Sequence, residues 1–255
     1  MRQLWRFGLE QAKSCIFAVV IFSALAITQF IEISFIHRYD FILIICLLTQ
    51  LLMLTSKLET WDELKVICVF HLIGLALEIY KVHMGSWSYP EEAMSKVFGV
   101  PLYSGFMYAS VASYLCQAWR RMDVQLMKWP PTWTVAILSA AIYFNFFTHH
   151  YIYDFRWIFK AATILLFFQT IVYFKVNQRT YKMPVVLSFA LIGFFIWIAE
   201  NIATFFGAWQ YPGQSETWEI VHFSKISSWL LLVIVSFLIV AMLKHIKGKD
   251  NGNYV

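Results

Sequence analysis

Residues 66–90 read VICVFHLIGLALEIYKVHMGSWSYP, an apolar run that ends in a short polar and aromatic loop. Residues 188–212, SFALIGFFIWIAENIATFFGAWQYP, repeat this arrangement 122 positions later. The shared positions are Glu78, Gly85, Trp87, Tyr89 and Pro90 in the first stretch and Glu200, Gly207, Trp209, Tyr211 and Pro212 in the second. A carboxyl group inside an apolar run, found twice with the same loop after it, predicts a two-fold site in a membrane protein.

The composition supports a membrane protein. Of the 255 residues, 60% are hydrophobic and only 14% are charged, whereas soluble domains carry about 25% charged residues. Apolar runs recur along the whole chain, and about 20 such residues in a helix cross a bilayer. The sequence therefore predicts an all-α fold, a polytopic transmembrane helical bundle. The four cysteines form no Cys-x-x-Cys pair, which argues against a disulfide framework.

We expect about eight helices, arranged as two parallel-oriented four-helix repeats within one integral membrane domain. Residues 1–122 would hold helices one to four, and residues 123–255 helices five to eight. Because four helices separate equivalent points, the two repeats would face the same way across the membrane. The expected helices cover roughly residues 14–36, 41–56, 65–82, 98–119, 132–149, 157–176, 185–206 and 220–244.

The basic residues predict the orientation of these helices. With the N-terminus inside, fourteen of the 20 lysines and arginines fall in cytoplasmic segments and six in outer ones. Cytoplasmic loops of membrane proteins carry an excess of Lys and Arg. We therefore expect a multi-pass protein of the cell membrane with both termini in the cytoplasm and both aromatic loops on the outer side.

The candidate site lies around the two glutamates. A carboxyl group at membrane depth is costly unless it is protonated, paired or hydrated, so Glu78 and Glu200 are the candidate catalytic residues. Candidate substrate-binding residues come from the two loops, from the fourth helix and from the start of the last one: Trp87, Tyr89, Trp209, Tyr211, Tyr108, His222 and Lys225. The same glutamates would equally serve to fix their own loops by hydrogen bonds, and Lys225 would suit an ion pair with one of them.

Five of the seven histidines gather on the expected outer side, but none shows the spacing of a zinc motif. We therefore expect no metal site and no other cofactor. The lipid bilayer is the expected partner, with a lipophilic small molecule as a candidate ligand, and no nucleic acid. The oligomeric state stays open.

A family resemblance adds to this interpretation. Residues from Glu78 to Tyr114, with GSWSYPE at 85–91 and GVPLYSGFMYASV at 99–111, resemble the YoaT-type family of uncharacterised bacterial integral membrane proteins, domain of unknown function 817. The likeness extends over most of the chain and implies class and topology, not chemistry. A looser motif similarity is to membrane carotenoid cyclases and hydratases, whose acidic residues after the Pro-Leu step are replaced here by Tyr103 and Ser104.

These observations leave three functions open. The first is an outer-leaflet cavity around the paired glutamates that binds a lipophilic isoprenoid-like substrate, with one glutamate as acid and the other as base. The second is a proton-coupled transporter of a small solute. The third is a structural membrane protein without a small-molecule site. Whether the chain is an enzyme is not decided by the sequence.

Overall fold

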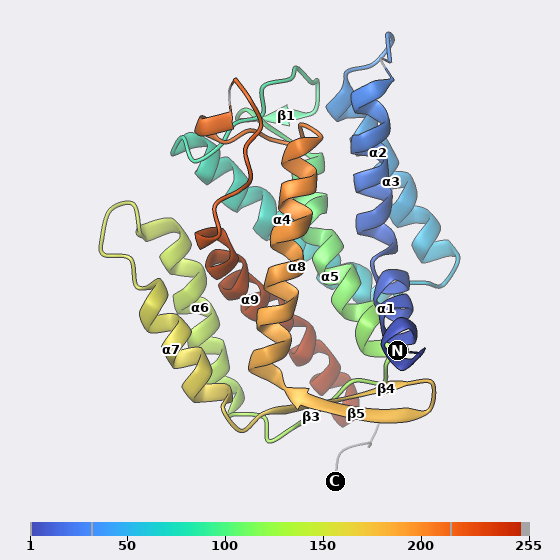
Figure 1. Ribbon diagram of the computed structural model, residues 1–255, viewed down its shortest axis with the longest axis vertical. Helices are drawn as coiled ribbons and strands as arrows, with labels where there is room; N and C mark the ends of the chain where they lie inside the picture. Colours follow the sequence, from blue (N-terminus) through green and yellow to red (C-terminus); the bar gives the residue numbers. More distant parts are fainter. Residues whose placement is uncertain (1, 32, 215, 251–255) are drawn as a thin grey trace. The chain divides into compact units, whose positions relative to one another are not determined.

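The structure is a computed structural model that describes residues 2–31, 33–214 and 216–250. Within these residues the chain is mainly helical, as the sequence predicts, with nine α-helices and five short strands (Figure 1). The helices are α1 Arg2–Ser14, α2 Ile16–Phe30, α3 Arg38–Thr55, α4 Trp61–His83, α5 Tyr103–Arg121, α6 Thr132–Thr148, α7 Arg156–Phe167, α8 Val185–Phe205 and α9 Ser224–Asp250. The strands are β1 Lys96–Val97, β2 Val100–Pro101, β3 Gln125–Met127, β4 Ile171–Val176 and β5 Arg179–Pro184, and a 3-10 turn, η1, covers Pro212–Gln214.

Four of the described helices are long and apolar enough to cross a membrane: α3, α4, α8 and the segment Ser224–Ala241 of α9. The pair α1 and α2 adds a fifth if the two count as one span, although they are bent by 71°. Helix α6 is also apolar but has only 17 residues. These helices are compatible with a membrane protein, while the arrangement of eight spans in two repeats stays a prediction.

The helix predicted over 157–176 is wrong in its second half. Helix α7 ends at Phe167, and residues 171–176 form strand β4 instead. Burial alternates along this strand, with Val172, Phe174 and Val176 buried and their neighbours more exposed, which is the period of two typical of a strand. Asn177 and Gln178, with φ of 48° and 65°, form the two-residue turn into β5. Positive φ at both positions matches the tight turn that antiparallel strands prefer.

The helix predicted over 14–36 is also wrong at its boundaries. Helix α1 already reaches Ser14, the helix is interrupted at Cys15, and α2 ends at Phe30. The residues exposed on α1 include Leu4 and Trp5, and Glu10 forms a 3.9 Å ion pair with Arg121. The 71° bend between α1 and α2 makes the charged first helix a separate element from the apolar run that follows it.

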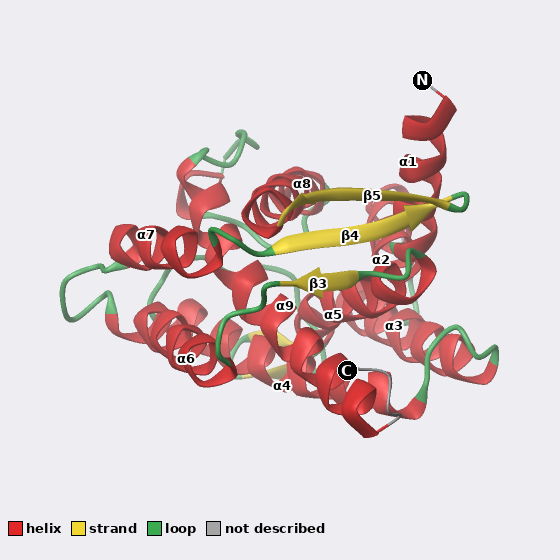
Figure 2. Ribbon diagram, turned by 90° about the horizontal axis from the view of Figure 1, so that it is seen from below, coloured by secondary structure: helices red, strands yellow, loops and turns green. Residues whose placement is uncertain are grey.

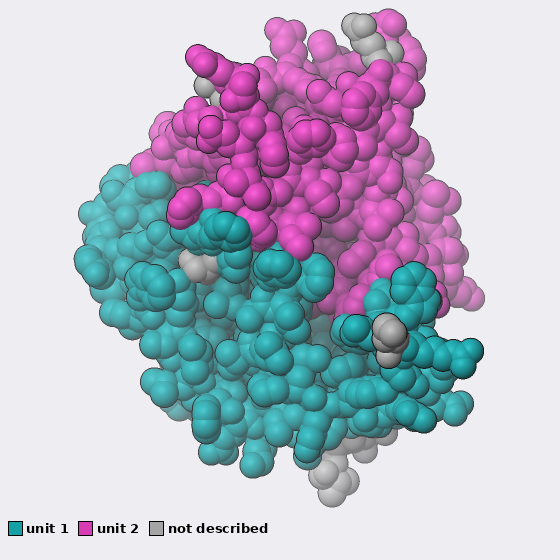
Figure 3. Space-filling model, viewed as in Figure 1, with its two compact units in different colours: residues 1–10, 118–196, 223–255 teal, residues 11–117, 197–222 magenta. Residues whose placement is uncertain are grey.

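The chain divides into two compact units (Figure 3). Unit 1 comprises residues 1–10, 118–196 and 223–255. Its strands form an antiparallel sheet in the order β3-β4-β5 (Figure 2). Its core is aromatic: the ring of Phe189 lies 5.6 Å from that of Phe167 and 5.1 Å from that of Phe237.

Unit 2 comprises residues 11–117 and 197–222, so it contains both glutamates and both aromatic loops. Helices α2 and α3 pack along each other, and Phe17, Leu25 and Ile42 are part of the core between the elements of this unit. Helix α4 begins with a capping box, in which Thr60 accepts from the amide of Glu63 and the Glu63 side chain accepts from the amide of Thr60. With 23 residues, α4 is about 34 Å long and carries Glu78 near its far end.

Candidate functional site

The two helices that carry the glutamates end in the same way. Gly85 after α4 and Gly207 after α8 have φ of 67° and 68°, a conformation in which glycine is favoured. Each glycine amide donates to a carbonyl three residues back, and the next amide donates to a carbonyl five residues back, at 2.9–3.0 Å in both loops. This pair of bonds is the Schellman motif. Both loops therefore leave their helices in the same direction, which fixes where the following aromatic side chains point.

The two loops then pair with each other. Ser88 and Gln210, which occupy the same position in the two loops, form an antiparallel bridge in which each amide donates to the other's carbonyl at 2.9 Å. The residues on either side of this bridge also meet, because the rings of Trp87 and Tyr211 lie 6.0 Å apart, edge to face. The structure thus brings together the two sequence signatures in unit 2.

Glu78 accepts three hydrogen bonds from neutral donors. The Trp87 indole and the Tyr89 hydroxyl both donate to its Oε2 atom at 2.7 Å, and the Tyr108 hydroxyl donates to its Oε1 atom at 2.7 Å. Glu78 is only 4% exposed. In the described part of the chain, no basic group bonds to it. Two of its donors come from the loop and one from α5, so the glutamate holds the loop against that helix.

Glu200 has a related environment. It is 3% exposed, and the Tyr211 hydroxyl donates to its Oε1 atom at 2.5 Å. Burial raises the pKa of Tyr211 well above its usual value, the carboxylate of Glu200 raises it further, and the carboxylate of Glu78 does so as well. Both carboxylates therefore act on the pKa of the same phenol. The pKa of Tyr89 is likewise well above its usual value, because of burial first and the Glu78 carboxylate second.

The remaining predicted site residues are Trp209, His222 and Lys225. Trp209 is buried in the core of unit 2, two residues before Tyr211 in the second loop. His222 is exposed in the segment before α9. Lys225 is in the first turn of α9, which belongs to unit 1, whereas both glutamates belong to unit 2. An ion pair between Lys225 and a glutamate therefore stays a prediction.

The sequence did not point to Arg38, which holds the second loop. Its guanidinium donates to the carbonyl oxygens of Phe206 and Gly207 after α8 and pairs with Glu91 of the first loop segment. It also donates to Thr28 at 2.9 Å. A cation at the carbonyl groups that end a helix is favourable. In the sequence Arg38 counted only as one of the outer charges.

The two residues after Arg38 complete this attachment. Tyr39 is fully buried and its hydroxyl lies 3.4 Å from the carbonyl oxygen of Gly207. Asp40 accepts from the amides of Met94 and Ser95 at 2.8 Å each. An arginine, a tyrosine and an aspartate in one helical turn after an apolar run were the signal in the sequence, and it is a weak one because such residues commonly face water at helix ends.

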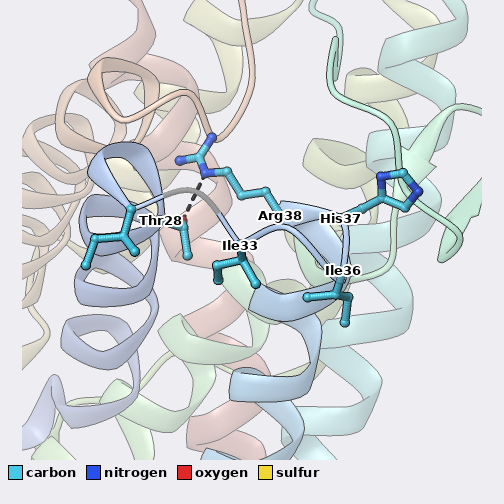
Figure 4. A pocket seen from close by; sticks show the side chains of 6 residues that line it. Thr28, Ile33, Ile36, His37 and Arg38 are labelled. Atoms are coloured by element: carbon cyan, nitrogen blue, oxygen red, sulfur yellow. Dashed lines mark hydrogen bonds between the residues drawn. The ribbon is translucent and has the colours of Figure 1, made fainter.

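The pocket shown in Figure 4 lies at the turn between α2 and α3, away from the predicted site residues. Its volume is about 250 Å³, and Arg38 points across it toward Thr28 (Figure 4). The residues that line it are Thr28, Ile31, Ile33, Ile36, His37 and Arg38. Neither Glu78 nor Glu200 lines it, so the expected cavity around the paired glutamates stays a proposal. Among the described residues, no group of three or more His, Cys, Asp or Glu side chains could hold a metal ion.

Comparison with known proteins identifies the family. The family model described as "Protein of unknown function (DUF817)" matches residues 3–237. The chain belongs to this family. Within it, the chain is 67% identical over 250 residues to the uncharacterised protein YoaT of Bacillus subtilis (strain 168), a match that covers 98% of the chain and 95% of YoaT. The family resemblance expected from residues 78–114 is confirmed, while a similarity to carotenoid cyclases is not shown.

One solved structure resembles the fold of this DUF817 protein. It is the crystal structure of a cross-linked trimer of an MvINS variant, which matches with a TM-score of 0.51 at 12% sequence identity. The match covers 73% of the present chain and 95% of the MvINS chain. At this identity the likeness concerns the fold alone.

Proposed function

We propose that this DUF817 protein is a proton-coupled membrane transporter of a small solute, in which Glu78 and Glu200 share the proton. The observation that supports it is the pair of buried carboxyl groups, each of which accepts from a phenol of its own loop, together with the backbone pairing of the two loops. Burying a carboxylate among neutral donors, as at Glu78, is costly, and two carboxylates that sense each other favour a state with one proton between them. Such a pair is suited to binding and releasing a proton.

The paired loops give this proton a mechanical effect. Tyr89 and Tyr211 donate to the two glutamates and sit next to the Ser88–Gln210 bridge. An ionised carboxylate accepts from the phenol of its own loop with a full set of lone pairs, whereas a protonated one has fewer lone pairs to offer. Uptake of a proton would therefore weaken the attachment of a loop to its glutamate, and release would restore it. In the proposed cycle, this change opens and closes the outer side.

The test measures proton binding and proton movement separately. Infrared difference spectra of the purified protein, recorded across pH, should contain a band of a buried protonated carboxyl group that is absent in Glu78→Gln or Glu200→Gln. In proteoliposomes, a potassium diffusion potential should drive proton flux that is lost in the same variants. Glu92→Gln, on an exposed loop, is the matched control and should behave as wild type. A wild-type protein with neither the band nor the flux rejects the proposal.

Conversion of a lipophilic isoprenoid-like substrate is the second candidate. The aromatic loop residues suit it, since Trp and Tyr rings stabilise carbocations, but it requires the loops to separate so that a substrate reaches Glu78. Expression in a host that makes carotenoids and quinones tests it. New or missing species in lipid extracts that disappear in both Glu→Gln variants would favour conversion over transport.

We also propose that both termini are cytoplasmic, as the distribution of basic residues favours. A reporter that is active only outside the cytoplasm, fused after Val255, should be silent. Activity of that fusion would reverse the orientation and place the paired loops on the inner side.

A further inference from the structure

Helix α4 carries three polar groups on the face that it turns toward the interior of unit 2. Glu63, His71 and Glu78 are eight and seven residues apart, which places them on one side of the helix. Glu63 and Glu78 are buried and His71 is half-buried. Along the helix axis the two steps are about 12 and 10 Å. A row of titratable groups at two-turn intervals through a membrane helix is costly, so it needs a reason beyond packing.

His71 lies where α4 crosses α5, and the crossing is built from two glycines, Gly74 of α4 and Gly105 of α5. The ring of Tyr108 fills the place that a Cβ atom of Gly74 would take. The ring of His71 fills the place of a Cβ atom of Gly105, at 2.7 Å. The Tyr108 ring therefore covers the helix face between His71 and Glu78, and its hydroxyl reaches Glu78.

Two polar atoms at this crossing have no hydrogen-bond partner in the described chain. They are Nδ1 of His71 and Oγ of Ser104, the neighbour of Gly105. Ser104 is fully buried, and it shares a face of α5 with Tyr108, one turn away. A buried hydroxyl or ring nitrogen without a partner costs free energy, and ordered water usually supplies the missing bond in protein interiors.

A second set of such atoms lies near the start of α4. Glu59 is 2% exposed and accepts from Gln50 at 2.5 Å and from the Ser113 hydroxyl. Gln117 follows Ser113 by one turn of α5, is fully buried, and has no partner for either amide atom within the described residues. The interior of unit 2 thus holds unpartnered polar atoms near the first carboxyl group of the row and again at its middle.

We propose that these groups form a proton relay, from Glu59 and Glu63 through His71 to Glu78, with water bound at Gln117, Ser104 and His71. The steps conserve the proton. Glu63 passes a proton through water to one ring nitrogen of His71, the other ring nitrogen releases a proton toward the Tyr108–Glu78 pair, and the ring returns to its starting charge. The inference rests on the proposed function, because it gives the path by which the proton reaches the paired glutamates.

The test is potential-driven proton flux in proteoliposomes that contain the full chain. Ser104→Ala, Gln117→Leu and His71→Gln should each reduce flux about tenfold, as the loss of one hydrogen-bond partner or one titrating ring in the path predicts. Ser110→Ala is the matched control, because this buried hydroxyl on the same helix already donates to the Met107 carbonyl at 2.7 Å. It should conduct as wild type.

The outcomes separate the relay from the proposed function. If Glu78→Gln abolishes flux while Ser104→Ala, Gln117→Leu and His71→Gln conduct as wild type, the relay is overturned and the proposed function stands. If wild type carries no flux, both are overturned. Thermal stability provides a second readout, since replacing a buried polar side chain and its bound water by an apolar side chain removes both hydrogen-bond partners and is nearly neutral or stabilising. Ser104→Ala and Gln117→Leu that are at least as stable as wild type but lose flux support the relay, because a folding defect then does not explain the loss.

Discussion

Ser88 and Gln210 exchange two backbone hydrogen bonds of 2.9 Å although 122 residues separate them. Because they occupy equivalent positions in the two signature loops, each loop is the other's partner. The contact is self-complementary in the sense of a two-fold interface, in which one surface meets its own counterpart. The proposed duplication of residues 1–122 and 123–255 would give such a contact a simple origin.

A disulfide should trap this pairing. In an antiparallel pair that exchanges both hydrogen bonds, the Cα atoms lie about 5.5 Å apart, which is within the range of a disulfide. Ser88→Cys with Gln210→Cys should cross-link under mild oxidation, as mass spectrometry of the digested protein would show. The trapped protein should lose proton flux, and reduction should restore it. Efficient cross-linking without loss of flux would mean that the loops need not separate.

The two loop glycines should respond differently to alanine. Both Gly85→Ala and Gly207→Ala force a residue with a side chain into a left-handed conformation, which costs about 1–2 kcal/mol. A Cβ atom at Gly85 meets nothing within 4 Å, whereas one at Gly207 lies 3.2 Å from Arg38 Nη1 and 3.3 Å from Gln29. Thermal unfolding in detergent should therefore show a larger loss for Gly207→Ala. Gly213→Ala, with open space around it, is the control.

Removing the hydroxyl of Tyr108 should destabilise unit 2. In Tyr108→Phe, the Oε1 atom of Glu78 loses its bond from α5 and stays buried, which costs about 1–3 kcal/mol. Tyr153→Phe removes the same hydroxyl from an exposed ring and should be neutral. Equal stability of the two variants would show that Glu78 does not depend on this donor.

Alkaline pH should weaken the fold through Tyr89. Burial and the Glu78 carboxylate hold its folded pKa well above the ordinary value near 10. Above about pH 10 the unfolded chain loses the phenol proton while the folded protein keeps it, so the unfolding free energy falls by about 1.4 kcal/mol per pH unit. Tyr89→Phe should show a shallower decline between about pH 10 and 11 in unfolding experiments. An unchanged slope would contradict the burial of this hydroxyl.

Arg38 should not tolerate lysine. Its guanidinium reaches Thr28, Glu91 and the carbonyl oxygens after α8 at once, and an ammonium group cannot reproduce this planar set of donors. We expect Arg38→Lys to lower the free energy of unfolding by about 1–3 kcal/mol. Lys96→Arg is the opposite exchange, at a lysine of β1 whose ammonium donates to the Tyr89 carbonyl of the first loop at 2.7 Å. A stable Arg38→Lys protein with intact loops would assign the attachment to Tyr39 and Asp40.

The sequence predicted the parts of this molecule that depend on local pattern. The runs that became α3, α4, α6 and α8 were recognised within a few residues, because length and hydropathy suffice for apolar helices. The loop residues Trp87, Tyr89 and Tyr211 were linked to their glutamates, since five matching residues at one offset of 122 positions are a strong signal, and all three donate to those glutamates.

What the sequence missed depends on distant partners. Residues 171–176 are as apolar as the helical segments of the chain, and only their pairing with β3 and β5 decides that they form a strand. Arg38 belongs to the site because of the carbonyl groups of Phe206 and Gly207, which are far away in the chain, and no local pattern encodes them. In both cases the deciding contact is absent from the surrounding sequence.

The crossing of α4 and α5 limits how unit 2 can change shape. Each helix inserts an aromatic ring into a notch that a glycine leaves in the other, His71 into Gly105 and Tyr108 into Gly74. Rings seated in opposite notches prevent one helix from sliding along the other, but they leave rotation about the contact open. Any opening of the loops above Glu78 would then be a swing about this fixed pivot, and the same contact would keep His71 in place while the ends of the helices move.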